Sequence, residues 1–170
     1  MGPGAFYAIA IAVVALDQAV KAWIRHSMRL DTSIPLWPGV FQITYTQNTG
    51  MAFSLLEGAI PLLAAAALLV IGVIVVAQVR AGRNMSPLLG VALALPLGGA
   101  VGNLIDRVCM RYVTDMLDFR LIHFPIFNVA DSAITIGVGL LAWRTLTMKE
   151  TPATPTSRAR PEGSPEEAVS

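Results

Sequence analysis

The sequence has few charged residues and almost no cysteine. Charged side chains make up 14% of its 170 residues, 55% of the residues are hydrophobic, and the mean hydropathy is +0.63. A soluble domain of this size seldom has that balance, so the composition predicts a membrane protein. The formal net charge is +1 and no long basic tract is present, so we expect no nucleic-acid partner.

Cys109 is the single cysteine, which excludes an internal disulfide and a multi-cysteine zinc site. Neither metal-ligand spacing nor a phosphate-binding glycine loop is present, so we expect no metal or other cofactor. The N-terminal run MGPGAFYAIAIAVVAL lacks a positive start and a small-residue cleavage site. We therefore interpret it as a retained span rather than a cleaved signal.

Four apolar stretches approach the length of about 20 residues that a spanning helix needs. They cover residues 4–24, 59–79, 88–108 and 126–147. We expect an all-α membrane protein with four transmembrane helices in a domain of residues 1–149. Residues 150–170 are rich in Pro, Ser and Glu without apolar periodicity, so we predict a disordered cytoplasmic tail.

An even number of spans puts both termini on one side and the loops 25–58 and 109–125 on the other. The polar residues of the spans then all lie beside those two loops. In the short connection 80–87, two arginines have no acidic neighbour, which favours a cytoplasmic side for it and for both termini. Residues 36–56 contain alternating β-branched and aromatic residues between turn signals, which predicts a short sheet on the membrane surface.

Asp131 lies in an otherwise apolar stretch, where an ionisable group costs about 2.5–3.5 kcal/mol and usually has a function. Alternatively, it is a carboxylate at a helix start, stabilised by the helix dipole. Asn128, three residues earlier, shares its helix face and favours a function.

Asp115 and Asp118 follow the third span, and either can be an ordinary solvated loop acid. The topology nevertheless brings Asp115 back to the start of the fourth span, near Asp131. Two neighbouring carboxylates that share a proton supply one base and one acid. Such a pair can activate water for attack on a peptide carbonyl and protonate the leaving amine.

Other polar residues near these spans allow two interpretations. Asp106 and Arg107 can form an interfacial ion pair, or Arg107 and Asn103 can hold a substrate carbonyl or the catalytic loop. Asp17 and Lys21 have the i, i+4 spacing of a helical salt bridge.

Two other nucleophile arrangements lack a supporting motif. They are a Ser54–Lys21 dyad and a pair of Cys109 with His123 or His26. Two other functions also stay open at this point. A small proton-coupled transporter would use Asp131 and Asp17 as a relay, and an assembly protein would pair helices through Gly98 and Gly102.

Four sequence segments carry a resemblance to a known family. They are DQAVK at 17–21, NTGMAFS at 48–54, GGAVGNLIDR at 98–107 with YVTD at 112–115, and FNVADSAI at 127–134. In this order, at the ends of four spans, they resemble the lipoprotein signal peptidase (signal peptidase II) family over about residues 10–145. The sequence departs from the family in having Arg111 where glycine is common and Met116 where an aromatic residue is common.

The resemblance implies four membrane helices with an extracytoplasmic β-cradle, in the bacterial cytoplasmic (inner) membrane. It implies an aspartyl dyad, Asp115 and Asp131, that removes the signal peptide of prolipoproteins just before a diacylglyceryl-modified cysteine. Residues that order the site and hold substrate backbone would be Asn48, Asn103, Arg107 and Asn128. Residues with a structural or unassigned role would be Asp17, Lys21, Gly50, Asp106 and Asp118. We expect the lipid-modified precursor and membrane lipid as partners of a monomer.

Overall fold

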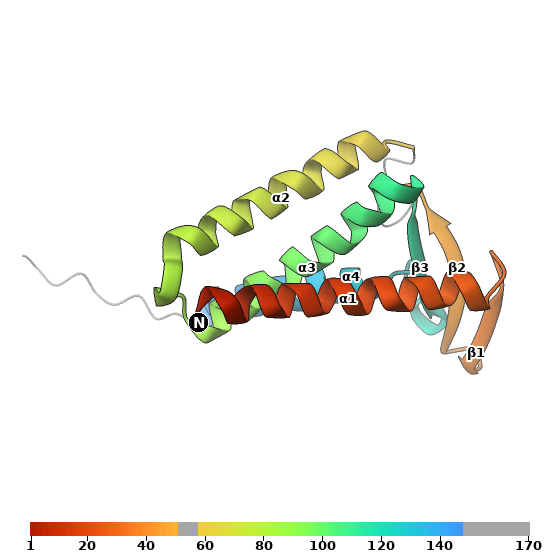
Figure 1. Ribbon diagram of the computed structural model, residues 1–170. Helices are drawn as coiled ribbons and strands as arrows, with labels where there is room; N and C mark the ends of the chain where they lie inside the picture. Colours follow the sequence, from red (N-terminus) through yellow and green to blue (C-terminus); the bar gives the residue numbers. More distant parts are fainter. Residues whose placement is uncertain (51–57, 148–170) are drawn as a thin grey trace, which may run out of the picture.

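The computed structural model describes residues 1–50 and 58–147, and within them four long helices and a small sheet (Figure 1). The helices are α1 (Pro3–Ser27), α2 (Ile60–Ala81), α3 (Pro87–Met110) and α4 (Val129–Thr147), with short 3-10 turns η2 (Gly82–Asn84) and η3 (Arg120–Ile122). Each of the four is long and apolar enough to cross a membrane. The predicted four-helix fold with a small sheet is confirmed. Ser54 and the predicted disorder of the tail lie outside the described residues.

Local sequence signals explain where α3 begins and ends. Pro87 occupies the first turn, where its missing N–H costs no hydrogen bond, and the Ser86 hydroxyl accepts from the Leu89 N–H at 3.3 Å. The helix ends at Met110, and the next residue, Arg111, has a left-handed φ of 65°. Glycine adopts this conformation without strain. Arg111 therefore adopts the left-handed conformation that glycine would adopt more easily.

Helix α3 lies at the centre of the bundle and contacts the other three helices (Figure 1). In its most apolar segment 56% of the residues are buried, whereas the share is 11–17% in the corresponding segments of the other three helices. Small residues allow this close packing: a Cβ on Gly98 would lie 2.6 Å from the Ala10 carbonyl oxygen of α1. Gly98 and Gly102 thus pack against α1 of the same chain, which accounts for this pair without a second copy.

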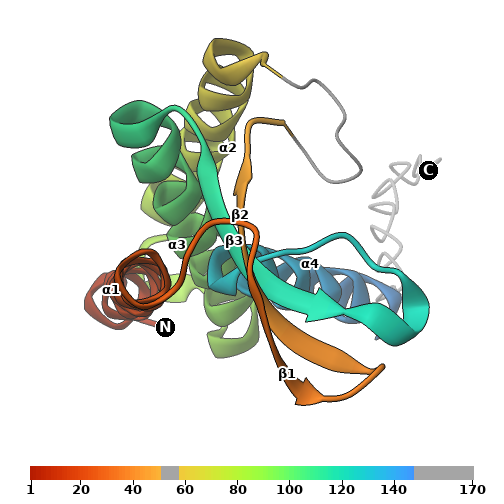
Figure 2. The same ribbon diagram turned by 90° about the vertical axis from the view of Figure 1, so that its right-hand side faces the viewer.

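The sheet has three antiparallel strands in the order β1 (Ser33–Trp37), β2 (Phe41–Asn48) and β3 (Val113–Phe119). It stands at one end of the bundle, across the helix ends (Figures 1 and 2). The sequence analysis did not identify β3, which lies in the predicted connection 109–125 and pairs with β2. Strand β3 is buried on both faces, so it lacks the alternation that reveals a half-exposed strand.

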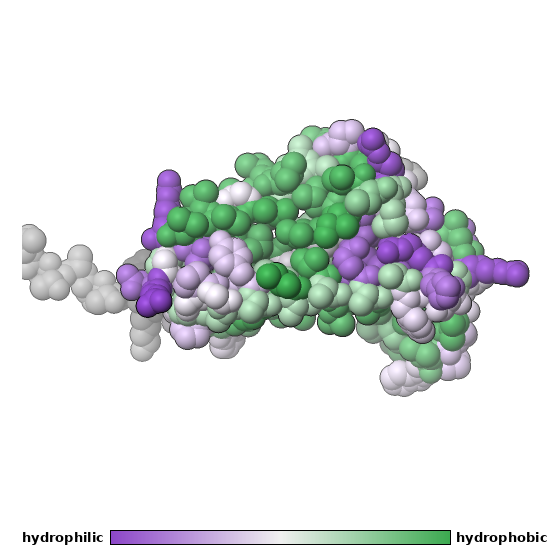
Figure 3. Space-filling view, viewed as in Figure 1, coloured by the Kyte–Doolittle hydropathy of each residue, from purple (hydrophilic) through white to green (hydrophobic). Residues whose placement is uncertain are grey.

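Apolar side chains form a belt over the middle of the bundle, and hydrophilic residues gather at its two ends (Figure 3). The N-terminus and the α2–α3 connection lie at the end away from the sheet (Figure 1). This arrangement agrees with an even number of spans and with polar helix ends beside the sheet.

Candidate active site

Asp115 and Asp131 reach the same cleft from different elements. Asp115 lies on β3 opposite Thr46 of β2, and only 2% of it is exposed. Asp131 lies in the first turn of α4. Both line a cleft of about 600 Å³ that also contains Asn48, Asn103 and Arg107. The fold therefore brings together two carboxyls that are 16 residues apart in the sequence.

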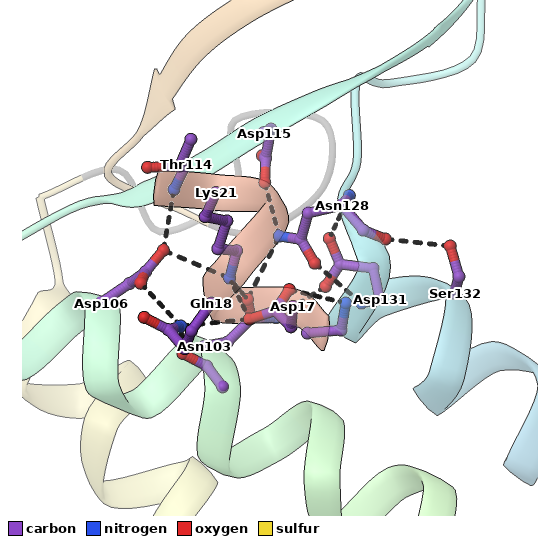
Figure 4. Close-up of polar contacts among 12 residues, drawn as sticks. Asp17, Gln18, Lys21, Asn103, Asp106, Thr114, Asp115, Asn128, Asp131 and Ser132 are labelled. Atoms are coloured by element: carbon purple, nitrogen blue, oxygen red, sulfur yellow. Dashed lines mark hydrogen bonds and ion pairs between the residues drawn. The ribbon is translucent and has the colours of Figure 1, made fainter. Parts of the chain in front are cut away.

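Asn128 connects the two carboxyls (Figure 4). Its side-chain Nδ2 donates to Asp115 Oδ1 at 2.7 Å, and its backbone N–H donates to Asp131 Oδ2 at 3.2 Å. The Asp131 N–H donates back to Asn128 Oδ1 at 2.9 Å, which closes a reciprocal cap at the start of α4. One fully buried residue thus fixes both acids.

Two further asparagines each hold one carboxyl. Asn48 Nδ2 donates to Asp115 Oδ2 at 2.9 Å, and Asn103 Nδ2 donates to Asp131 Oδ1 at 2.8 Å. Asn48 in turn accepts from the Gly50 N–H at 2.8 Å. Three amides, all from predicted site residues, therefore orient the carboxyl pair.

Arg107 lines the cleft, and its guanidinium donates to the Gly50 carbonyl at 3.2 Å. The ion pair of Arg107 with Asp106 that the sequence allowed is not among the ion pairs of residues 1–50 and 58–147. Successive residues on a helix point about 100° apart, so Asp106 faces the helix interface while Arg107 faces the cleft. Arg107 keeps further N–H donors that a substrate carbonyl can use.

Asp17, Lys21 and Asp106 form a fully buried charge cluster behind the cleft (Figure 4). Lys21 Nζ lies 2.9 Å from Asp17 Oδ2 and 3.2 Å from Asp106 Oδ2, so the i, i+4 salt bridge is present and extends to α3. Asp17 Oδ1 accepts from the Ala130 N–H at 3.0 Å, at the start of α4. Asp106 Oδ2 accepts from the Thr114 N–H at 3.0 Å, next to Asp115 on β3. The cluster thus joins α1, α3, α4 and β3.

Gln18 belongs to this cluster although the sequence analysis did not single it out. Its Nε2 lies 3.1 Å from Asp17 Oδ2, from the Gly102 carbonyl and from Asp106 Oδ1. The sequence signal that could have identified Gln18 is its position directly after Asp17 in the DQAVK segment.

Asp118 does not join the carboxyl pair, and it is not a solvated loop acid either. It is 3% exposed, and its Oδ2 accepts from Thr44 Oγ1 and Gln42 Nε2, each at 2.8 Å. Arg120 Nε lies 3.0 Å from the same oxygen. Asp118 therefore connects β3 to β2 and η3.

Burial, together with the neighbouring Asp131 charge, raises the pKa of Asp115 from its usual 3.8 to about 7. The hydrogen bonds from Asn48 and Asn128 and the Lys21 charge oppose this rise only in part. Asp115 therefore exchanges its proton near neutral pH, which suits a group that must both give and take one.

One wall of the cleft is apolar, and the sequence analysis did not identify it. Its residues are Phe124, Pro125, Ile126, Phe127, Ile134 and Ile136. Residues 124–127 belong to an irregular connection whose hydrogen bonds to β3, such as Phe127 N–H to the Leu117 carbonyl at 3.1 Å, fix its course. No periodic pattern predicts such a segment.

The alternative nucleophiles gain no support from the described residues. Cys109 is exposed, and no hydrogen bond in the described part of the chain joins it to His26 or His123. The Lys21 ammonium is already bonded to two carboxylates.

Comparisons with known proteins agree on one family. The family model described as Signal peptidase (SPase) II matches residues 9–147. The lipoprotein signal peptidase of Brevibacillus brevis is 50% identical over 137 residues, which cover 80% of this chain and 91% of that protein. That of Gloeobacter violaceus is 43% identical over 157 residues, covering 90% of each chain. A bacterial membrane enzyme solved by the in meso method is 34% identical, with a TM-score of 0.78 over 85% of this chain and 88% of that one.

Proposed function

Because the chain belongs to the signal peptidase II family, we propose that it is an aspartic endopeptidase that cleaves prolipoproteins just before a diacylglyceryl-modified cysteine. Family membership makes it a multi-pass membrane peptidase of lipoprotein signal peptides. The aspartic mechanism rests on one observation: Asp115 and Asp131 line the same cleft, and amide donors hold each of them. The neutral-range pKa of Asp115 supports the same assignment.

In the proposed reaction, the two carboxyls share one proton. The ionised carboxylate takes a proton from a water molecule, whose oxygen attacks the carbonyl carbon of the residue before the cysteine. The protonated carboxyl donates a hydrogen bond to the carbonyl oxygen as its negative charge develops. Collapse of the tetrahedral intermediate breaks the C–N bond, and the cysteine nitrogen receives a proton from a carboxyl. The free amino group leaves, and the pair returns to one proton.

The cleft residues have separate roles in this mechanism. Asn48, Asn103 and Asn128 orient the carboxyls before substrate arrives, which lowers the reorganisation needed in the transition state. Arg107 holds the segment at Gly50 and offers its remaining donors to substrate backbone. The apolar wall at 124–127 and on α4 suits the lipid-bearing part of the substrate.

The proposed setting is the bacterial inner membrane, with the termini in the cytoplasm and the cleft at the extracytoplasmic face. The arginines of the α2–α3 connection support this orientation. All residues of the carboxyl pair and its amides come from one chain, which fits a monomer. The buried charges of α1 and α3, at Asp17, Lys21 and Asp106, are bonded to each other and to the backbone of β3 and of the start of α4, whereas a proton relay needs polar residues across the membrane depth.

Lipid modification of the precursor tests the proposed substrate. We expect the diacylglyceryl-modified prolipoprotein to be cleaved in detergent at least about 100-fold faster, in kcat/KM, than the unmodified precursor, because the acyl chains bind apolar surface. The measurement compares the two precursors at equal enzyme concentration, with mass spectrometry of the new N-terminus. Equal rates, or cleavage at another bond, would contradict the proposed specificity.

The pH dependence of kcat/KM tests the proton shared by the pair. The pKa of Asp115 in the folded protein is about 7, so its proton is present below that pH and is lost as the pH rises through it. We expect kcat/KM for the lipid-modified precursor to fall above about pH 7, since both carboxyls are then ionised. A profile that stays flat from about pH 6 to about pH 9 would be inconsistent with this proton.

A further inference from the structure

Lys21 is a fully buried lysine that faces the site without lining the cleft. Its Nζ lies 2.8 Å from Asn103 Oδ1. A lysine ammonium carries three N–H donors and no acceptor. Only the oxygen of the Asn103 amide can therefore face Lys21, and the amide has one stable orientation.

That orientation determines which hydrogen-bond donors reach the two carboxyls. With its oxygen toward Lys21, Asn103 points Nδ2 at Asp131 Oδ1, 2.8 Å away. Asn128 Nδ2 also donates to Asn103 Oδ1, at 3.1 Å, and to Asp115 Oδ1, at 2.7 Å. Both amides thus turn N–H donors toward the carboxyl pair (Figure 4).

Lys21 is itself fixed, by Asp17 at 2.9 Å and Asp106 at 3.2 Å. Arg25 NH1 stands 4.0 Å from Asp106 Oδ1, on the sheet side of the cluster. The charged and titratable groups that surround the Asn103 amide are Asp17, Lys21 and Arg25 from α1, Asp106 and Arg107 from α3, Asp115 from β3 and Asp131 from α4. Among these, only Lys21 donates to the Asn103 oxygen.

We propose that Lys21 is a positioning residue: it sets the direction of the Asn103 amide and thereby keeps the carboxyl pair in its singly ionised, reactive form. The inference rests on the aspartic mechanism proposed above. It assigns to the buried cluster a role in the reaction, in addition to holding the helices together.

Without the ammonium, the Asn103 oxygen keeps only the longer hydrogen bond from Asn128 Nδ2, at 3.1 Å, so the amide turns by half a rotation more easily. Its oxygen would then face Asp131 Oδ1, and two acceptors repel each other unless a proton lies between them. The proton shared by the two carboxyls would then lie on the carboxylate oxygen that has to accept a proton from water. The reactive fraction of enzyme at neutral pH would fall, while the substrate-binding surface stays the same.

The experiment replaces Lys21 with methionine in the full-length enzyme and measures cleavage of the lipid-modified precursor in detergent. We expect kcat to fall about 100-fold with little change in KM, as is typical of a misplaced catalytic group. The acidic limb of the kcat/KM profile should move to higher pH by about one unit, since the ionised pair loses a hydrogen bond. Lys21→Gln, whose Nε2 can donate to Asn103, should recover most of the wild-type pH profile.

Two further variants separate positioning from loss of structure. Asp17→Asn/Lys21→Met removes one positive and one negative charge, so it tests the same amide without changing the net charge of the cluster. Gln78→Met removes another buried polar side chain, which accepts a hydrogen bond from the Tyr7 hydroxyl at 3.1 Å and does not line the cleft. We expect Gln78→Met to lower thermal stability but to keep the wild-type kcat and pH profile per folded molecule.

A wild-type pH profile in folded Lys21→Met would overturn the proposal. Failure of all three Lys21 variants to fold would also overturn it, because Lys21 would then have only a structural role. Failure of the aspartic mechanism is seen separately, as full activity of an Asp115→Asn or Asp131→Asn variant.

Discussion

Replacing either Asp115 or Asp131 with asparagine should abolish cleavage of the lipid-modified precursor. Asparagine has nearly the same shape, but it cannot take a proton from water or return one to the leaving amine. General acid–base catalysis contributes about 100- to 10,000-fold, so we expect each variant to lose at least about 1,000-fold in kcat. Because the two carboxyls act as a unit, the double variant should be hardly slower than either single one.

Asp118→Asn is the matched control for these variants. Asp118 lies on the same strand as Asp115 and is also buried, but its partners are Thr44, Gln42 and Arg120 outside the cleft. We expect this variant to be less stable and to keep kcat near the wild-type value per folded molecule. Full activity of Asp115→Asn or Asp131→Asn, or equal losses in all three variants, would rule out the proposed pair.

Gly102→Ala should give a large loss of stability for a change of one methyl group. A Cβ at this position would lie 2.5 Å from Asp17 Oδ2, in the centre of the buried charge cluster. Asp17 cannot move away freely, because Lys21 and the Ala130 N–H hold its two oxygens. Overpacking and a weakened buried ion pair together should cost about 3 kcal/mol.

The measurement is thermal unfolding in detergent, where we expect the Tm of Gly102→Ala to fall by roughly 10 °C. Gly72→Ala is the matched control, since Gly72 is also helical and nothing lies within 4 Å of a Cβ there. Alanine favours a helix by up to about 1 kcal/mol, so its Tm should stay the same or rise slightly. A Tm of Gly102→Ala equal to that of Gly72→Ala would refute the close approach of α1 and α3.

The sequence predicted the helices well because a bilayer imposes a length and a composition on every span. It also predicted that the polar helix ends meet at one end of the bundle. These ends adjoin the two loops that an even number of spans places on the same side of the membrane. Strand β3 was missed for the opposite reason. Its residues Val113–Asp118 are nearly all buried, so no contrast between its faces marks it in the sequence.

The candidate site was predicted as a set of residue types but not as a set of contacts. Asn103 was expected to order the site and to hold substrate backbone, but its contacts with Lys21 and Asp131 were not predicted. Whether the oxygen or the nitrogen of this amide faces Lys21 depends on how closely α1 packs on α3. That distance is set by Gly98 and Gly102, and spacing along one helix cannot reveal it.

The hydrogen bond from the Ala130 N–H to Asp17 joins the first membrane helix to the last, across 113 residues of sequence. A growing chain that has not yet reached residue 130 holds Asp17, Lys21 and Asp106 but has no α4 to cover them. The carboxyl pair is likewise incomplete until Asp131 enters the membrane. If the proposed pair is catalytic, proteolytic activity therefore begins only after α4 has inserted, and the growing chain cannot cleave other membrane proteins that are being inserted beside it.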